Sequence, residues 1–360
     1  MTKRIALVLP NMTGGGAERV ALASAADLLA RGHEVDLVLL EARGELLPLV
    51  AADARVVDLR TPRGRSAVLP LARYLRERRP DALHAFMWPL TIIAILAHRL
   101  ARSKARLMVS DHTVLSQHVA SALHRRFLGW TTRLFYPAAD HRIVVSEQAG
   151  RDLERCSGIA FERFEVITNP ISPPTTIARD PEVERLWGGD ESRILTVGNL
   201  KPEKNHALLL RAFAKLEDRS ARLMIVGEGM LRAELCRLAE ELGISERVIM
   251  PGFALDPWPF YASADLFVLS SNYEGFPLVL AEAMYAGLPI VSTDCPTGPA
   301  QMLANGEFGR LAPLADPDAL AKAMAALLAE PVDRQLLRDR AMEMAGPSQL
   351  ARYQEILTAD

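Results

Sequence analysis

Short apolar segments alternate with longer segments of helical periodicity along the whole chain. The apolar segments, such as LFVLS at residues 266–270, lack the polar–apolar alternation of half-exposed strands, so they are typical of strands buried on both faces. Strands separated by helix-length segments predict parallel, doubly wound α/β sheets. The predicted strands comprise residues 5–9, 35–40, 82–86, 107–110, 142–146 and 165–168 in the first half and 193–197, 222–226, 248–250, 266–270 and 289–293 in the second.

The second half of the chain repeats the strand–helix pattern of the first, which predicts two Rossmann-like domains. The break lies in residues 173–189, a segment rich in proline and glycine that we interpret as a linker. The domains are therefore expected at residues 1–172 and 190–346. Ligands bind at the carboxyl ends of parallel strands, so two such domains facing one another would enclose a cleft lined by residues that follow strands.

Composition excludes several classes of protein. The hydrophobic content of 49% and charged content of 24% are those of a globular protein. Cys156, Cys236 and Cys295 are odd in number and form no Cys-x-x-Cys pair, which excludes a disulfide scaffold and a zinc ribbon. The most apolar stretch, residues 85–97, is far shorter than the ~20 residues of a spanning helix, and the N-terminus has no signal-peptide core. We therefore expect a cytoplasmic protein.

Charge is distributed unevenly between the two halves. Residues 1–180 contain 25 Lys and Arg against 18 Asp and Glu, whereas residues 181–360 contain 17 against 26. A basic half indicates an anionic partner. The arginines are scattered and no nucleic-acid recognition motif accompanies them, which leaves an anionic membrane surface or a phosphate-bearing substrate.

Two loops that follow predicted strands carry candidate phosphate-binding groups. The first, NMTGGGAER at residues 11–19, opens a helix, where glycines let backbone N–H groups approach an anion. It is neither a Walker loop nor a complete G-x-G-x-x-G, and a tight strand–helix turn explains it equally well. The second, VGNLKPEKN at residues 197–205, holds Lys201 and Lys204, which could neutralise a diphosphate or be solvated surface side chains.

The segment SNYEGFPLVLAEAM, residues 271–284, is the most informative of the chain. Pro277 suits the first position of a helix and Gly287 its C-terminal end. Glu274 would precede this helix, where its charge could simply favour the positive helix end. Glu282 would lie in the second turn, among apolar residues. A carboxylate in such surroundings needs a hydrogen-bond donor, for example a ribose hydroxyl.

Glu274 and Glu282 enclose Gly-Phe-Pro and resemble the Glu-x7-Glu motif of the retaining glycosyltransferases of family 4, which have the GT-B fold. Other segments occur in the order of that family. They are GGGAERV, SDH at 110–112, VSE at 145–147, TNP at 168–170, VGNLKPEKN, VGEG at 226–229 and STDCPTGP at 292–299. The resemblance covers the whole chain, and STDCPTGP is similar to bacterial enzymes that build capsule, lipopolysaccharide and other exopolysaccharide.

The resemblance implies a role for each matching residue. Glu282 would hold the nucleotide ribose and Glu274 the donor-sugar hydroxyls, while Lys204 would hold the diphosphate. His112 would lie beside the reacting side of the donor sugar, although a strand-end histidine satisfied by the backbone is the alternative. The implied catalytic residues are Glu274, His112 and Lys204, and the implied donor-binding residues are Gly15, Gly16, Asn199, Lys201, Lys204, Phe253, Glu274, Gly275, Phe276, Pro277, Leu278, Val279 and Glu282.

Two positions depart from the family pattern. Asn199 stands where many relatives have an arginine, so Lys201 would have to supply the second cation. Gln301 stands where a glutamate is usual.

The pair Asp316 and Asp318 resembles a metal-binding Asp-x-Asp, but it opens a helical segment, and acidic residues favour a helix N-terminus. The resemblance likewise implies that no metal and no other cofactor is needed.

Residues 121–136 carry apolar side chains at helical spacing, flanked by basic ones. Leu123, Phe127, Trp130 and Leu134 would form one face, which predicts packing against the core. A basic amphipathic helix with aromatic residues also describes an interfacial membrane anchor. The residues of this second interpretation, a membrane or acceptor surface, are Arg125, Arg126, Phe127, Trp130 and Arg133.

The resemblance implies a metal-independent transferase in bacterial surface polysaccharide synthesis. It would move a hexose or N-acetylhexosamine from a nucleotide sugar, with UDP preferred over GDP-mannose, to a lipid-linked glycan such as a polyprenyl-diphosphate carrier. The N-terminal domain would take the acceptor at the cytoplasmic face of the membrane, and the C-terminal domain would take the nucleotide. Residues 347–360 would form a helix that packs back on the N-terminal domain. A sugar-nucleotide 2-epimerase of the same fold and a non-catalytic sugar-nucleotide sensor are the rival functions.

Overall fold

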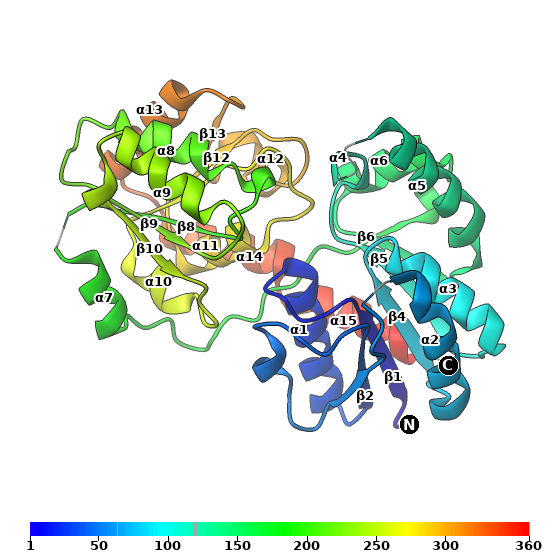
Figure 1. Cartoon of the computed structure of the whole chain (residues 1–360). Helices are drawn as coiled ribbons and strands as arrows, with labels where there is room; N and C mark the ends of the chain where they lie inside the picture. Colours follow the sequence, from blue (N-terminus) through cyan, green and yellow to red (C-terminus); the bar gives the residue numbers. More distant parts are fainter. Residues whose placement is uncertain (63, 119–120, 190, 360) are drawn as a thin grey trace. The chain divides into compact units, whose positions relative to one another are not determined.

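The computed structural model describes residues 1–359 except 63, 119, 120 and 190. The chain forms two compact units (Figure 1). Unit 1 contains Met1–Pro170 and the segment from Pro347 onward, and unit 2 contains Ile171–Gly346. Each unit is built around one parallel sheet.

Unit 1 has a seven-stranded sheet in the order β3-β2-β1-β4-β5-β6-β7, in which every pair of neighbours is parallel. Its strands are β1 (Arg4–Leu9), β2 (Glu34–Leu39), β3 (Arg55–Asp58), β4 (Ala82–Phe86), β5 (Arg106–Asp111), β6 (His141–Val144) and β7 (Glu165–Val166). Its helices are α1 (Gly16–Ala30), α2 (Val68–Arg78), α3 (Leu90–Ala101), α4 (Leu115–His118), α5 (Ala122–Phe135), α6 (Glu147–Ser157) and α15 (Pro347–Thr358).

Helices cover both faces of this sheet, which explains why its strands are apolar throughout. Ala6 and Val8 belong to a hydrophobic cluster that joins the sheet to α2, α3, α5 and α6. Helix α15 packs against α1 and β4 (Figure 1), and its Tyr353 is 1% exposed. The C-terminal helix therefore completes the hydrophobic packing of unit 1, although unit 2 precedes it in the chain.

Unit 2 has a six-stranded parallel sheet in the order β10-β9-β8-β11-β12-β13. Its strands are β8 (Arg193–Val197), β9 (Arg222–Val226), β10 (Val248–Gly252), β11 (Leu266–Leu269), β12 (Ile290–Thr293) and β13 (Arg310–Ala312). Its helices are α7 (Pro181–Trp187), α8 (His206–Ala214), α9 (Arg232–Glu241), α10 (Trp258–Ser263), α11 (Leu278–Ala286), α12 (Pro299–Met302), α13 (Pro317–Ala329) and α14 (Arg334–Ala345).

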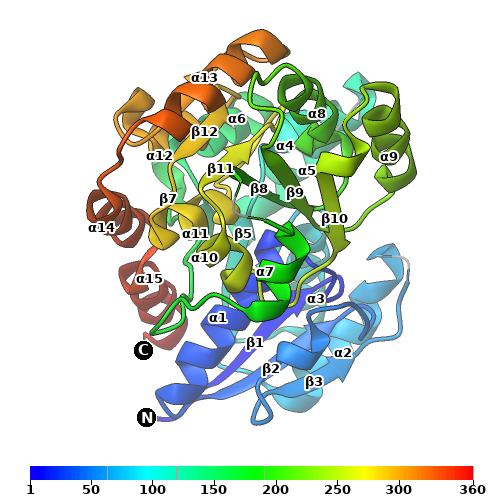
Figure 2. The ribbon, with the colours of Figure 1, turned by 90° about the vertical axis from the view of Figure 1, so that its left-hand side faces the viewer.

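The sheet of unit 2 also lies between two layers of helices, with α8, α9 and α13 on one face and α10, α11 and α14 on the other (Figure 2). Two doubly wound sheets of this kind confirm the predicted α/β fold class. The eleven predicted strands all form, with shifts of one or two residues at some ends. The short strands β3 and β13, each the last strand at one edge of its sheet, were not predicted, because their few residues carry no distinct apolar run.

The prediction of a linker over residues 173–189 is wrong for its second half. Residues 181–187 form helix α7, with Asp180 as N-cap and Pro181 in its first turn. Trp187 is 0% exposed and donates from Nε1 to Ser263 Oγ at 2.8 Å. Proline and glycine here begin and end a helix that packs on unit 2, since Gly188 is its left-handed C-cap.

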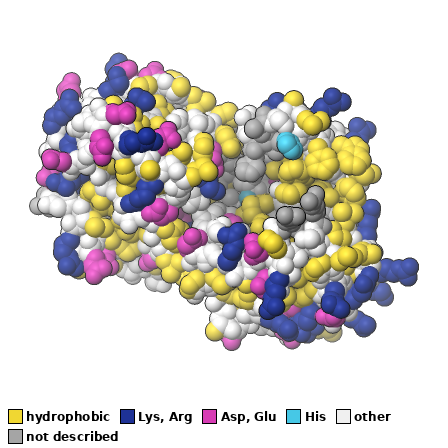
Figure 3. All heavy atoms as spheres, in the orientation of Figure 1, with side chains coloured by type: hydrophobic (Ala, Val, Ile, Leu, Met, Phe, Trp, Pro, Cys, Tyr) yellow, Lys and Arg dark blue, Asp and Glu magenta, His cyan; other side chains and the backbone are white. Residues whose placement is uncertain are grey.

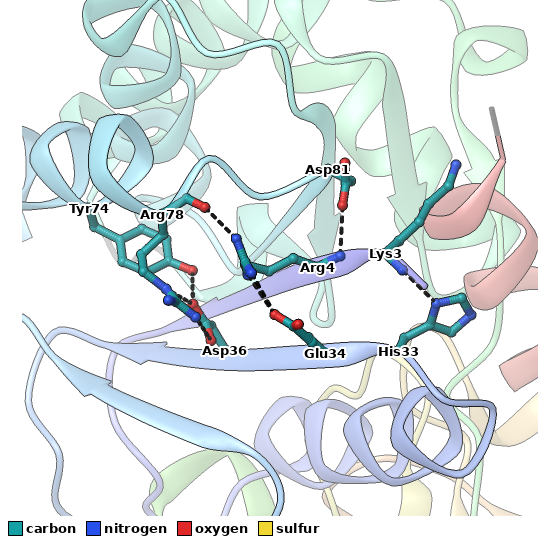
Figure 4. A network of polar contacts seen from close by, with 8 residues as sticks. All are labelled: Lys3, Arg4, His33, Glu34, Asp36, Tyr74, Arg78 and Asp81. Atoms are coloured by element: carbon teal, nitrogen blue, oxygen red, sulfur yellow. Dashed lines mark hydrogen bonds and ion pairs between the residues drawn. The ribbon is translucent and has the colours of Figure 1, made fainter. Parts of the chain in front are cut away.

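A buried carboxylate joins strand β2 to helix α2 in unit 1 (Figure 4). Asp36 is 2% exposed and accepts hydrogen bonds from the Tyr74 hydroxyl at 2.7 Å and from Arg78 Nε at 3.1 Å. Burial and the bond to Asp36 raise the pKa of Tyr74, so its hydroxyl keeps the proton that it donates. In the same network Arg4 donates to Glu34, and its backbone N–H donates to Asp81 at 2.7 Å.

Replacing Asp36 by alanine should destabilise unit 1 by about 2 kcal/mol, because a buried hydroxyl loses its acceptor and Arg78 its partner. The change is measured by urea denaturation. Glu77→Ala is the matched control, since it removes a carboxylate of α2 that is 67% exposed and pairs with Arg73; that pair should contribute less than about 0.5 kcal/mol. Equal losses in the two variants would contradict a special role for Asp36.

Candidate functional site

Lys204 and Glu274 form an ion pair at the carboxyl edge of the unit 2 sheet. Lys204 ends the 3-10 turn that follows β8, and Glu274 lies in the loop after β11. The distance from Lys204 Nζ to Glu274 Oε1 is 2.6 Å, and the Ser271 hydroxyl donates to the same oxygen at 2.6 Å. Glu274 is only 8% exposed, so its charge requires these partners.

The loop after β12 contacts the Glu274 loop and holds it in place. The Thr297 hydroxyl donates to the backbone oxygen of Glu274. Gly298 has a φ of +82°, and a Cβ there would lie 2.8 Å from Cδ of Pro277. Only glycine combines this backbone with such close packing. The segment STDCPTGP thus holds the Glu274 loop through the Thr297 hydroxyl and through the close packing of Gly298.

Glu282 projects from helix α11 and is 7% exposed. The Tyr261 hydroxyl donates to its Oε2 at 2.8 Å. This buried carboxylate has a hydrogen-bond donor, as predicted, but the donor belongs to the protein itself. Tyr261 lies on α10, and no sequence pattern indicated that this residue would reach Glu282.

Helix α11 begins one residue later than predicted. Pro277 is its N-cap, with φ −71° and ψ 106°, and Leu278 is the first helical residue. Gly287 ends the helix in the left-handed conformation, as expected. The backbone N–H groups of the first helical turn, which include those of Leu278 and Val279, have no acceptor within the helix. Gly275 and Phe276 precede the N-cap Pro277.

The loop with Asn199 and Lys201 is held by the VGEG segment after β9. The N–H of Gly198 donates to Val226, and that of Leu200 donates to Glu228. Gly227 has a φ of +150°, and a Cβ there would lie 2.0 Å from the backbone oxygen of Gly198, so the two loops are in backbone contact. Lys201 is exposed, whereas Lys204 and Asn199 are partly buried. Phe253, also partly buried, follows β10.

In unit 1, the glycine-rich turn after β1 leads directly into helix α1. Gly15 is the N-cap and Gly16 the first helical residue. A Cβ on Gly15 would lie 2.3 Å from Oε2 of Glu18, which is 7% exposed in the first turn of the helix. The turn is therefore a tight strand–helix connection, and it also places N–H groups at a positive helix end.

His112 lies at the carboxyl edge of the unit 1 sheet, immediately after β5. Its Nε2 is 2.9 Å from the Ser110 hydroxyl, and its Nδ1 is 2.8 Å from Oδ1 of Asn169. The ring stacks on Phe86, with centroids 5.4 Å apart. Burial lowers the pKa of His112 to about 4, so the ring is neutral at pH 7. The predicted alternative, a histidine satisfied by the backbone, is wrong, because its partners are side chains.

Helix α5 exposes the apolar face that was predicted to pack against the core. Leu123 is 76% exposed, Phe127 52% and Trp130 59%. Leu128, Gly129, Thr131 and Thr132 are buried instead. The Thr132 hydroxyl reaches the backbone oxygen of Leu128, which allows a polar residue to face the interior. The prediction of core packing is therefore wrong for the apolar stripe.

The Asp-x-Asp pair serves as a helix cap, as interpreted from the sequence. Asp316 is the N-cap of α13 and accepts from the N–H groups of Asp318 and Ala319. Asp318 pairs with Lys215 at 2.8 Å. Over the described residues, no group of three or more His, Cys, Asp or Glu side chains is arranged to hold a metal ion. No described helix is long and apolar enough to cross a membrane.

Two family models match the chain. The model described as Glycosyltransferase Family 4 matches residues 14–173, and the model described as Glycosyl transferases group 1 matches residues 182–344. The first match contains strands β2–β7 of unit 1, and the second contains all six strands of unit 2. Together with the two doubly wound domains, they identify the chain as a glycosyltransferase of the GT-B fold, with a family 4 N-terminal half and a group 1 C-terminal half.

Similar proteins include bacterial glycosyltransferases. The chain is 27% identical over 360 residues, covering 95% of both chains, to the N-acetylgalactosamine-N,N'-diacetylbacillosaminyl-diphospho-undecaprenol 4-alpha-N-acetylgalactosaminyltransferase of Campylobacter jejuni. It is 28% identical to the amylovoran biosynthesis glycosyltransferase AmsD of Erwinia amylovora, covering 86% of this chain and 85% of AmsD. The structure of Anabaena HepE in complex with UDP-glucose has the same fold, with a TM-score of 0.83 at 19% identity and coverage of 99% and 100%.

Proposed function

We propose that the protein transfers a hexose or N-acetylhexosamine from a nucleotide-diphosphate sugar, with retention of anomeric configuration, to a lipid-linked glycan. The main support is the Lys204–Glu274 ion pair, which places a cation and a carboxylate 2.6 Å apart at the carboxyl edge of the unit 2 sheet. In parallel sheets this edge is where ligands bind. UDP-sugars are the first candidates as donor and GDP-mannose the second.

In this proposal each group of unit 2 has one task. Lys204 stabilises the negative charge that develops on the leaving diphosphate, together with the backbone N–H groups at the start of α11. Lys201 supplies a second positive charge, because Asn199 is uncharged. Glu282, already oriented by Tyr261, accepts hydrogen bonds from the ribose hydroxyls.

Glu274 would orient the sugar and not attack it. Its Oε1 accepts from both Lys204 and Ser271, which lowers its nucleophilicity and fixes its direction. Sugar hydroxyls would bind to the remaining lone pairs. We therefore propose that the acceptor hydroxyl attacks on the face that the leaving group vacates, and that the departing diphosphate takes the acceptor proton. His112 of unit 1 would contact the donor sugar on its reacting side.

The acceptor is proposed from the relatives. The Campylobacter jejuni enzyme is named for a diphospho-undecaprenol acceptor, a sugar diphosphate attached to a long lipid. Unit 1, which contains most of the basic N-terminal half, would take an acceptor of this kind, because its arginines complement the diphosphate charge.

The donor assignment predicts distinct phenotypes for the two glutamates. A thermal-shift screen of UDP-glucose, UDP-N-acetylgalactosamine and GDP-mannose should identify a stabilising donor. Glu282→Ala should weaken binding of that donor about 5- to 150-fold, the effect of losing hydrogen bonds worth about 1–3 kcal/mol. Glu274→Ala should chiefly lower kcat.

Donor binding by Glu282→Ala that equals wild type would refute the ribose assignment. Product analysis in the absence of acceptor separates the rival functions. An epimerised nucleotide sugar would identify a 2-epimerase, and binding without any turnover would identify a sensor.

Catalysis should also be independent of metal. Lys204 and helix-end N–H groups provide the positive charge that a divalent cation supplies in other sugar-nucleotide enzymes. Turnover should therefore be unchanged in excess EDTA. Loss of activity in EDTA and its recovery with Mn²⁺ would contradict the proposal and make Asp316 and Asp318 the candidate metal ligands.

Helix α5 supports a second part of the proposal, a peripheral attachment to an anionic membrane. Its exposed stripe, Leu123, Phe127, Trp130 and Leu134, has a regular helical spacing. Figure 3 shows hydrophobic side chains gathered over this part of unit 1, with Lys and Arg side chains at the margin. Arg126 and Arg133, which are exposed and seven residues apart, lie along one flank of the stripe, and Arg125 adds a third charge. Apolar side chains beside arginines match the boundary between acyl chains and anionic headgroups.

Charge reversal on this helix should release the protein from anionic vesicles. Each arginine near the surface contributes about 1 kcal/mol, so Arg126→Glu/Arg133→Glu should reduce flotation with phosphatidylglycerol vesicles strongly, and added salt should weaken wild-type binding. Arg185→Glu/Arg219→Glu changes two exposed arginines of unit 2 and should float like wild type. Equal recovery on neutral and anionic vesicles, or none on either, would refute the electrostatic attachment.

A further inference from the structure

A chain of four buried or partly buried polar side chains crosses the carboxyl edge of the unit 1 sheet. His84 lies on β4, Ser110 on β5, His112 directly after β5, and Asn169 after β7. His84 Nε2 is 2.8 Å from the Ser110 hydroxyl, which is also 2.9 Å from His112 Nε2. His112 Nδ1 is 2.8 Å from Asn169 Oδ1. His84 and Ser110 are 0% exposed and Asn169 is 2% exposed.

Because the amide oxygen of Asn169 faces His112, the direction of each hydrogen bond in this series follows. An amide oxygen only accepts, so His112 Nδ1 carries a proton and donates to Asn169. A neutral imidazole has one N–H, so His112 Nε2 has a lone pair and accepts from the Ser110 hydroxyl. Ser110 Oγ in turn accepts from His84 Nε2. The second ring nitrogen of His84, Nδ1, then has no proton.

The surroundings of His84 agree with this direction. Its Nδ1 is buried and has no hydrogen-bond partner among the described residues. Tyr353 of α15 covers the ring, with centroids 5.6 Å apart, and Phe86 lies against it at 3.8 Å. The opposite direction would place an N–H donor at this enclosed atom, and buried N–H groups without acceptors are rarer than bare acceptors.

We propose that Ser110, His84 and Asn169 are positioning residues that hold His112 as the neutral Nδ1–H tautomer in one ring orientation. The inference rests on the proposed function, because His112 matters only if it meets the donor sugar. In this arrangement His112 is not a proton donor to the leaving group. It presents a fixed, uncharged ring, while the Ser110 hydroxyl occupies its Nε2 lone pair. Helix α15, which follows unit 2 in the sequence, covers His84 at one end of this series of hydrogen bonds.

The tautomer can be measured without any activity assay. Histidine labelled with ¹⁵N on both ring nitrogens gives long-range ¹H–¹⁵N correlations that distinguish the two tautomers and the charged ring. The signals of His112 and His84 are assigned by their loss in His112→Gln and His84→Gln. At pH 7 we expect the Nδ1–H form for His112 and the Nε2–H form for His84. The Nε2–H form or a charged ring at His112 would overturn the proposal.

Kinetics then separate positioning from a merely structural role. Ser110→Ala should lower kcat for release of UDP from UDP-N-acetylgalactosamine or UDP-glucose about tenfold, the loss of one hydrogen bond, with the donor KM within about twofold. Ser110→Thr should restore most of the rate because it restores the hydroxyl. Ser24→Ala, which removes a buried hydroxyl of α1 without a partner in the described part of unit 1, should keep the wild-type kcat.

An unchanged kcat in Ser110→Ala, with only a lower Tm, would show that the chain of hydrogen bonds is structural and would overturn the proposal. If neither UDP-sugar nor GDP-mannose is turned over, the donor assignment fails, and the NMR measurement still decides the state of His112. The failure of the positioning proposal and the failure of the proposed function are therefore distinguishable.

Discussion

Parallel pairing of the strands is the constraint on which the rest of the structure depends. Because neighbouring strands in each sheet run in the same direction, the loops that follow them meet at one edge. In unit 2 this brings together Lys204 after β8 and Glu274 after β11, and the loop with Thr297 after β12. In unit 1 the same constraint brings His112 next to Asn169, which are 57 positions apart in sequence.

Buried polar groups at these edges are stabilised by partners within the same unit. Glu274 has Lys204 and Ser271, and Glu282 has Tyr261. Such pre-arranged charges need little reorganisation when a ligand with a changing charge binds or reacts. The opposite edge of the unit 1 sheet is different, since Asp36, Arg78 and Arg4 connect only structural elements there. The candidate functional residues of unit 1 and this network thus lie at opposite ends of the strands.

The two units differ in the side chains that they bury and expose. Unit 2 has two buried carboxylates, Glu274 and Glu282, each hydrogen-bonded to other side chains of that unit. Unit 1 has a neutral histidine held by side chains and an exposed helix whose apolar stripe has arginines on its flank. Helix α15 belongs to unit 1, where its Tyr353 lies over His84, although it follows unit 2 in the sequence.

The amino-acid sequence by itself determined the fold class, eleven of the strands and the segments of the candidate site, because a strand buried on both faces leaves a continuous apolar run and the residues after it are adjacent in the chain. Tertiary structure alone decided which side chains are partners. Tyr261 reaches Glu282, and His84 reaches Ser110, through contacts between elements that no local pattern records. Tertiary structure also decided the orientation of α5. A helical stripe of Phe, Trp and Leu has the same periodicity whether it faces a core or solvent, and here the neighbouring helices pack against Leu128 and Thr132 instead.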